Sequence, residues 1–234
     1  MHMDRRQFVK NLGLGTASLS MGSLVTASSC APSGDSSLKQ NVKEGEDGQF
    51  LFIGDDIAIA QTEYGKVQGY LLNHVYTFLG VPYGADTSGK NRFMPPQKPE
   101  PWTDVRPAVF YGNTAPQRME NRWPNNYGTF ADHWNYWDVS EDCLYLNVWT
   151  PGIADGKKRP VLVWLHGGGF TNGSGIEQDG YHGENISREG DIVFCSINHR
   201  LGPIGFSDLS GVGGEAYKDS GNVGMLDIIA ALRW

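Results

Sequence analysis

Residues 161–170, Val-Leu-Val-Trp-Leu-His-Gly-Gly-Gly-Phe, join an apolar run directly to three consecutive glycines. A continuous apolar run of this length is typical of a strand that is buried on both faces, as in a parallel sheet. Residues 192–197 form a second such run, and we expect a loop and a short helix around 184–189 between the two. Buried strands joined by crossovers predict an α/β fold, a sheet flanked by helices.

Three neighbouring segments extend this prediction. Residues 144–149 alternate between two kinds of side chain, which predicts a strand with two different faces. Residues 223–234 carry apolar side chains at helical spacing. Residues 57–68 and 71–79 predict a hairpin or meander around Tyr64-Gly65.

The glycines at 167–169 are the first candidate for chemistry. Glycine lets the backbone turn sharply and approach a ligand, so N–H groups can point into a cleft. Such N–H groups can stabilise a developing oxyanion. The alternative for a Gly-Gly-Gly turn is a plain loop. Residues 211–214 (Gly-Val-Gly-Gly) lack a buried strand before them, so we interpret them as a turn and not as a dinucleotide loop.

Residues 140–148, Ser-Glu-Asp-Cys-Leu-Tyr-Leu-Asn-Val, resemble a signature of the type B carboxylesterase family, which includes the cholinesterases. Further matches follow in order along the chain, so the resemblance covers roughly residues 50–234. These are residues 78–83 (Phe-Leu-Gly-Val-Pro-Tyr), 92–93 (Arg-Phe), 115–117 (Ala-Pro-Gln), 166–170 (His-Gly-Gly-Gly-Phe), 198–202 (Asn-His-Arg-Leu-Gly) and 221–227 (Gly-Asn-Val-Gly-Met-Leu-Asp).

This resemblance implies the α/β-hydrolase fold and hydrolysis of a small-molecule carboxylic ester by a Ser/His/acid triad. It also implies that the N–H groups of Gly168 and Gly169 hold the tetrahedral oxyanion, with a third donor after the serine. No cofactor or metal is expected.

Two departures from the family pattern matter. Ala115 stands where many members have a cysteine that pairs with the signature cysteine, so Cys143 is expected to be a free thiol. The 234 residues also contain no Gly-x-Ser-x-Gly; Ser174 comes nearest, with Asn172 and Ile176 at the glycine positions. We therefore expect a fold truncated before the nucleophile elbow, and a chain that is inactive by itself.

The resemblance further implies two ion pairs, Arg92 with Glu141 and Arg200 with Asp227; the alternative is solvated surface charge. The remaining chemistry-bearing residues have structural interpretations. Cys195 lies in an apolar run, which favours a buried inert thiol. We expect His199 to be structural and His166 to hold the glycine loop. The carboxylates at 138, 141 and 142 indicate a charged turn before a strand more than an acid pair.

The N-terminus indicates an export signal at residues 1–30. Arg5-Arg6 and Lys10 precede an uncharged, weakly apolar stretch, and this order resembles the twin-arginine signal. The alternative is a surface helix with an accidental arginine pair. Small residues before Cys30 resemble a lipoprotein cleavage site, which would anchor the chain to a membrane through a lipid on Cys30; the alternative is ordinary cleavage nearby. Residues 31–48 have the composition of a flexible tether before a domain at 49–234. A periplasmic or cell-envelope lipoprotein is expected.

The composition argues against three other classes of protein: collagen-like, membrane-spanning and nucleic-acid-binding proteins. Glycine is abundant, 31 of 234 residues, yet shows no collagen period, and the apolar runs are far shorter than a membrane span needs. The net charge of −7 and the lack of a long basic run argue against binding nucleic acid.

Two other functions compete with ester hydrolysis. The same family contains adhesion proteins that keep the fold and lose the triad, so a non-catalytic binding protein is the main alternative. The dense aromatic stretch at 102–149 is compatible with a carbohydrate-stacking surface. Within it, residues 123–137 are expected near the mouth of a substrate cleft.

Overall fold

Apolar and β-branched side chains build a mixed sheet at the centre of the protein. The computed structural model describes residues 50–118 and 138–234. The larger sheet has six strands in the order β1-β4-β5-β7-β9-β8. They are β1 (Leu51–Phe52), β4 (Tyr70–Leu72), β5 (Val75–Pro82), β7 (Tyr145–Thr150), β8 (Val161–Leu165) and β9 (Val193–Ile197). The predicted export signal, the tether and residues 123–137 lie outside the described residues.

Strand β7 is the middle of this sheet. It pairs antiparallel with β5 on one side and with β9 on the other, and β8 pairs parallel with β9. The turn at Tyr64–Gly65 joins β2 (Ile59–Gln61) to β3 (Lys66–Gln68), which form a smaller sheet with β6 (Arg106–Pro107). A second hairpin joins β4 to β5. The predicted turn at Tyr64–Gly65 is therefore present, but residues 57–68 and 71–79 contribute to two different sheets and do not form one hairpin.

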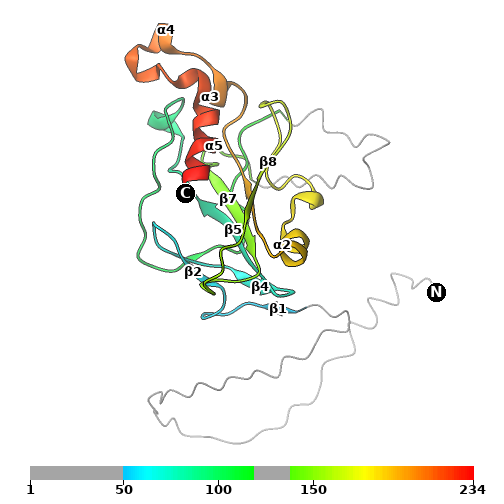
Figure 1. Cartoon of the computed structure of the whole chain (residues 1–234). Coiled ribbons are helices and arrows are strands. Elements are labelled where there is room, and N and C mark those ends of the chain that lie inside the picture. The colour runs from blue at the N-terminus through cyan, green and yellow to red at the C-terminus, as the bar shows by residue number, and fades with distance from the viewer. Residues whose placement is uncertain (1–49, 119–137) are drawn as a thin grey trace, which may run out of the picture. The chain divides into compact units, whose positions relative to one another are not determined.

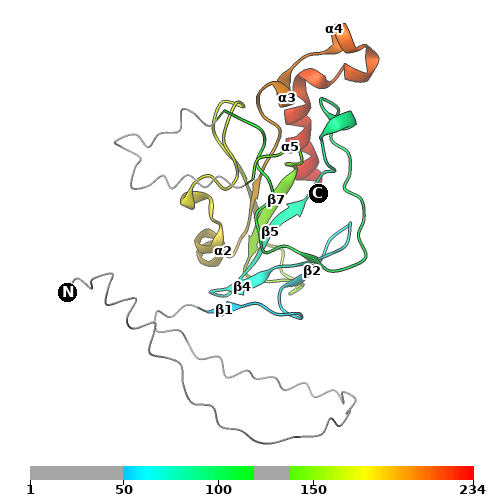
Figure 2. The ribbon, with the colours of Figure 1, turned by 180° about the vertical axis from the view of Figure 1, so that it is seen from behind.

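Helices cover both faces of the larger sheet. Helix α2 (Glu184–Gly190) lies on one face and α5 (Val223–Arg233) on the other, as the two opposite views show (Figures 1 and 2). The remaining helical segments are shorter: α3 (Gly202–Phe206), α4 (Ser210–Gly213), η1 (Gly89–Asn91), η2 (Asp179–Tyr181), η3 (Glu215–Tyr217) and η4 (Ser220–Asn222). The helices predicted around 184–189 and 223–234 are both present, and residues 211–214 lie in a single helical turn and the bend after it.

The alternation along β7 supplies a core on each side of the sheet. Leu146 belongs to one buried cluster with Phe78 and with Ile228 of α5, whereas Trp149 belongs to a second cluster with Phe194. Leu146 and Trp149 are both buried. Burying one large apolar side chain contributes roughly 1.5–3 kcal/mol, so this strand anchors both layers.

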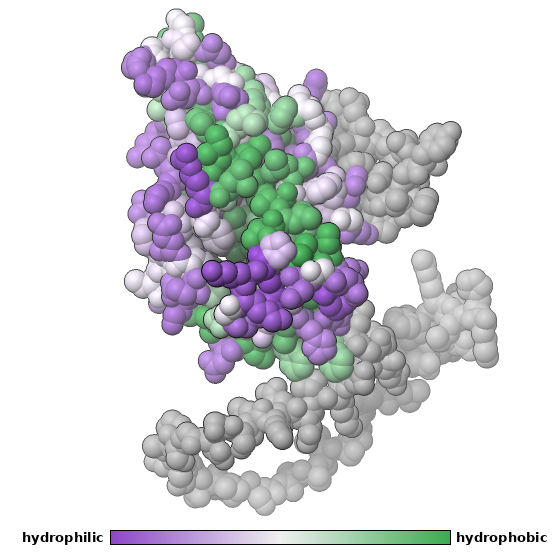
Figure 3. Space-filling model, in the orientation of Figure 1, coloured by the Kyte–Doolittle hydropathy of each residue, from purple (hydrophilic) through white to green (hydrophobic). Residues whose placement is uncertain are grey.

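Strand β8 corrects one prediction. Its apolar run was expected to be buried on both faces, but Val161 is 63% exposed and Leu165 is 46% exposed. The reason is position, because β8 is the last strand of the described sheet and pairs only with β9 there. Its side chains and those of Met225, Ile229 and Leu232 on α5 leave a continuous apolar area on this side of the molecule (Figure 3).

No helix within the described ranges has the length and apolar character to cross a membrane.

Candidate functional site

The glycine loop begins where β8 ends. Gly168 and Gly169 have φ angles of +114° and +61°, in the region that favours glycine. A Cβ on Gly168 would overlap the carbonyl oxygen of Asn172, whereas a Cβ on Gly169 would meet nothing within 4 Å. Position 168 therefore requires glycine both for its backbone angle and for space.

The Gly168 carbonyl is bound by residues of the loop itself. The Gly168 carbonyl accepts hydrogen bonds from Thr171 N at 3.1 Å, from Thr171 Oγ1 at 2.9 Å and from Asn172 N at 3.3 Å. Within the part of the chain that the structure describes, the N–H groups of Gly168 and Gly169 donate no hydrogen bond. Two consecutive N–H donors are thus without a hydrogen-bond partner among the described residues, and an oxyanion hole is built from backbone donors of this kind.

Two contacts fasten the loop to the rest of the fold. Gly202 N donates to Phe170 O at 2.7 Å, next to the glycines. At the far end, Gly173 N donates to Gln117 Oε1 at 2.8 Å and Gln117 Nε2 donates back to Gly173 O at 2.9 Å. The sequence showed Gln117 only as part of a family motif, because a single glutamine carries no signal of a partner 56 residues away.

A cavity of about 540 Å³ lies beside the loop. Pro116, Gln117, Arg118, Thr171, Asn172, Gly202 and Pro203 line it. Its volume is in the range of small-molecule sites, and the loop that carries the free N–H donors forms part of its wall.

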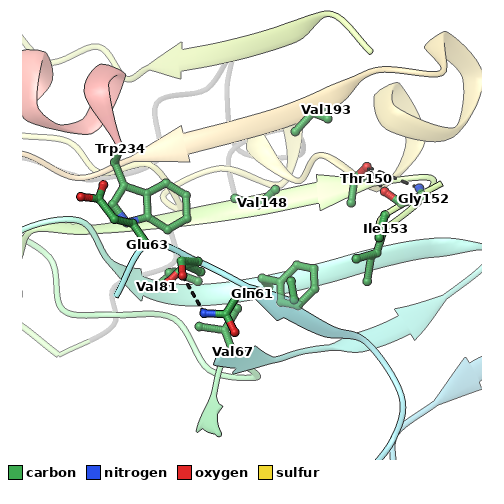
Figure 4. A pocket seen from close by; sticks show the side chains of 14 residues that line it. Gln61, Glu63, Val67, Val81, Val148, Thr150, Gly152, Ile153, Val193 and Trp234 are labelled. Carbon is green, nitrogen blue, oxygen red and sulfur yellow. Dashed lines mark hydrogen bonds between the residues drawn. The ribbon is translucent and has the colours of Figure 1, made fainter. Parts of the chain in front are cut away.

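A second cavity, of about 450 Å³, lies away from the loop (Figure 4). Its wall is mostly apolar and includes Val67, Val81, Val148, Ile153 and Trp234. Among the described residues, none of the glycine loop lines it, whereas Thr171 and Asn172 of that loop line the first cavity. We therefore assign the chemistry to the cavity beside the glycine loop.

Two histidine rings, one of them within the glycine loop, pack against each other. The rings of His166 and His199 stack with centroids 4.9 Å apart and an interplanar angle of 13°. His199 is buried, and its Nδ1 lies 2.9 Å from Arg200 O. Burial lowers the pKa of His199 below its ordinary value, so the fold favours the neutral ring. The geometry agrees with structural roles for both histidines.

Both predicted ion pairs are present. Arg92 Nε lies 2.7 Å from Glu141 Oε2 in a partly exposed pair. Arg200 and Asp227 are fully buried, with Arg200 Nη2 at 2.6 Å from Asp227 Oδ1 and Nε at 2.8 Å from Oδ2. Burial raises the pKa of Asp227, and the hydrogen bonds and charge of Arg200 oppose that rise. This pair holds the segment that follows His199 against α5.

The thiols and the carboxylate turn are structural. Cys143 is free and Cys195 is buried, as predicted, and Cys143 is buried as well. Burial raises the pKa of Cys195 to about 12. Neither thiol is a nucleophile at neutral pH. Asp142 accepts a hydrogen bond from Tyr145 Oη at 2.8 Å. Across the described ranges, no three His, Cys, Asp or Glu side chains gather as a metal site.

Ser174, the serine nearest to the Gly-x-Ser-x-Gly pattern, is buried. Its Oγ accepts a hydrogen bond from Ile176 N at 3.3 Å, as in a local turn. The Ser174 hydroxyl therefore binds the local backbone, and Ser174 does not line the cavity beside the loop.

A protein-family model described as "Carboxylesterase family" matches residues 56–234. The chain belongs to the carboxylesterase family. Its folded part therefore has the α/β-hydrolase fold, as the family resemblance predicted.

Named relatives agree with this membership. This carboxylesterase-family chain is 41% identical over 179 residues to para-nitrobenzyl esterase from Bacillus subtilis (strain 168), which covers 75% of this chain and 34% of the relative. It is 38% identical over 199 residues to acetylcholinesterase from Electrophorus electricus, covering 79% and 30%.

A solved structure of an esterase from Clostridium hathewayi superposes with a TM-score of 0.71 at 39% identity, covering 80% of this chain and 35% of the other. That Clostridium esterase can hydrolyse aliphatic aromatic polyesters. The chain spans about a third of the length of the curated relatives that it matches.

Proposed function

We propose that a polypeptide containing these residues hydrolyses carboxylic esters, and that this chain contributes its oxyanion hole. The observation that carries the proposal is the pair of N–H donors at Gly168 and Gly169, which the described fold leaves unused beside a cavity. Membership of the carboxylesterase family supports the same chemistry.

In this mechanism a serine hydroxyl attacks the ester carbonyl while a histidine takes its proton. Negative charge then develops on the carbonyl oxygen, and the N–H groups of Gly168 and Gly169 stabilise it. Donors of this type are rigid and already oriented, so they act mainly on the transition state; removing one costs roughly 10²–10³ in kcat in measured cases. The substrate class is a small carboxylic ester, in line with the esterase names of the relatives.

We propose that the nucleophilic serine and its partners come from polypeptide outside these 234 residues. The sequence has no Gly-x-Ser-x-Gly, and the relatives are about three times as long as the part that this chain matches. The apolar area over β8 and α5 supports this proposal, because a soluble protein normally covers a patch of this kind with further protein.

Export and anchoring complete the proposal. Residues 1–30 act as a twin-arginine-type signal, Cys30 receives a lipid and residues 31–48 tether the enzyme to the cell envelope. The order of charge, apolar stretch and small residues before Cys30 supports this.

The test is hydrolysis of p-nitrophenyl acetate, with and without a serine-directed organophosphate. We expect the 234-residue chain alone to be inactive, and a polypeptide that extends to the length of the relatives to be active and fully inhibited. Stoichiometric inhibition of activity in the short chain would show a nucleophilic serine within it. An inactive long polypeptide would favour a non-catalytic binding protein instead.

A further inference from the structure

The carboxamide of Gln117 binds the backbone of Gly173 as a neighbouring strand would. It accepts from Gly173 N at 2.8 Å and donates to Gly173 O at 2.9 Å. Its Nε2 also lies 3.1 Å from Ala115 O. A carboxamide offers one donor and one acceptor side by side, so it pairs with both polar groups of one residue.

Gly173 in turn touches the other limb of the glycine loop. A Cβ on Gly173 would overlap Gly167 O and the His166 ring, and its φ is +111°. One residue earlier, Asn172 O fills the space where a Cβ on Gly168 would lie. The returning limb, residues 172–173, is therefore in direct contact with residues 166–168 of the limb that carries the two N–H donors.

The base that carries Gln117 is itself firmly held. Thr114 N donates to Asp138 O at 2.8 Å, and Ser140 N donates back to Thr114 O at 3.0 Å. Asn198 Nδ2 donates to Asn113 O at 2.9 Å, so this base is also tied to the segment after β9. Gln117 thus connects an anchored segment to a loop that has left-handed backbone angles at Gly168, Gly169 and Gly173.

We propose that Gln117 is a positioning residue, which sets the N–H groups of Gly168 and Gly169 through its paired hydrogen bonds to Gly173. The proposal rests on the proposed function, because it assigns Gln117 to the geometry of that oxyanion hole. Its role follows from having a donor and an acceptor together. In the Gln117→Glu variant, an ionised carboxylate would keep the bond from Gly173 N and lose the bond to Gly173 O, and the Gln117→Ala variant would lose both.

The kinetic test uses the polypeptide that contains the nucleophile, with Gln117→Ala and Gln117→Glu. We expect kcat to fall about 10- to 100-fold with KM within about twofold of the original, because oxyanion donors bind the transition state more strongly than the substrate. A fall in kcat below about threefold overturns the proposal.

The Gln117→Glu variant adds a readout that a purely structural role does not predict. A protonated carboxyl again has one donor and one acceptor, so it can restore both bonds to Gly173. The ratio of variant to original kcat should therefore rise as the pH is lowered through the glutamic acid pKa. A ratio that stays flat with pH overturns the assignment.

Hydrogen–deuterium exchange of the 234-residue chain separates this inference from the proposed function. Gln117→Ala should raise exchange across residues 166–173 at least fivefold, and leave that of β7 and β9 unchanged. The matched control is Gln97→Ala, which removes an exposed glutamine with one local hydrogen bond. Unchanged exchange in 166–173 contradicts the positioning role even where hydrolysis is observed. If exchange across residues 166–173 rises in Gln117→Ala but the long polypeptide is inactive, the proposed function is contradicted and the contact of Gln117 with the loop is not.

Discussion

Replacing Asp227 with Asn tests what holds the base of the candidate site in place. The Asp227 carboxylate accepts from Arg200 Nε, from Arg200 Nη2 and from the Arg200 backbone N at 2.8, 2.6 and 3.0 Å. Arg200 Nη1 donates further to Met94 O at 2.8 Å. Because both side chains are fully buried, the substitution leaves a guanidinium charge in the interior with no counter-charge.

The expected loss of stability follows from this burial. Removing one partner of a buried ion pair costs about 3–5 kcal/mol, since the remaining charge keeps its desolvation penalty. A domain of this size has a total stability of about 5–15 kcal/mol, so the variant should lose a large share of it. The double variant Arg200→Met/Asp227→Leu has no buried charge. Its loss of stability should be smaller, by about 2 kcal/mol or more, than the summed losses of the single variants Arg200→Met and Asp227→Leu.

Urea unfolding followed by tryptophan fluorescence measures both quantities, provided that the denaturant slope m is unchanged. The matched control is Glu141→Gln at the partly exposed pair with Arg92, which should shift the midpoint far less. A loss below about 1 kcal/mol for Asp227→Asn, or strict additivity in the double variant, would contradict the predicted cost of the unpaired buried charge.

Three further predictions concern export, pH and the glycine loop. Replacing Arg5 and Arg6 with lysine should leave precursor in the cytoplasm, and Cys30→Ala should abolish labelling with radioactive palmitate; normal export of the lysine variant would remove the twin-arginine assignment. Burial lowers the pKa of His199, so its stabilising contribution is complete above its ordinary pKa of about 6.5 and is lost as the pH falls toward the lowered value. The free energy of unfolding should therefore fall more steeply below about pH 6.5 in the original chain than in His199→Gln, and parallel curves would contradict this. Gly168→Ala should lower kcat of the complete enzyme at least about 100-fold, because a Cβ cannot fit there; a rate within tenfold would contradict the requirement for glycine.

The fold was largely predictable from local patterns. The predicted helix around 184–189 is α2 and the predicted strand at 192–197 is β9, because apolar spacing and length decide such elements. The exposure of β8 was not predictable. An apolar run shows that a strand is suited to burial, but the neighbour that covers it is a tertiary property.

The candidate site was predictable in part, for a related reason. The glycines at 167–169 could be assigned to the site because residues 166–170 match a motif of the family; by themselves, three glycines are equally compatible with a plain loop. The hydrogen bonds between Gln117 and Gly173 could not be predicted from the sequence, because these residues meet only after β8 and β9 have been placed. Their hydrogen bonds join segments far apart in the chain, and no short sequence pattern reports such contacts.

A structure of an enzyme adduct would show whether Gly168 and Gly169 form an oxyanion hole. A crystal structure of the complete enzyme with a serine-bound phosphonate places a charged oxygen where the tetrahedral oxyanion forms. We expect this oxygen to lie about 2.7–3.1 Å from both Gly168 N and Gly169 N. An adduct whose oxygen is directed away from both glycines, toward other donors, would contradict it.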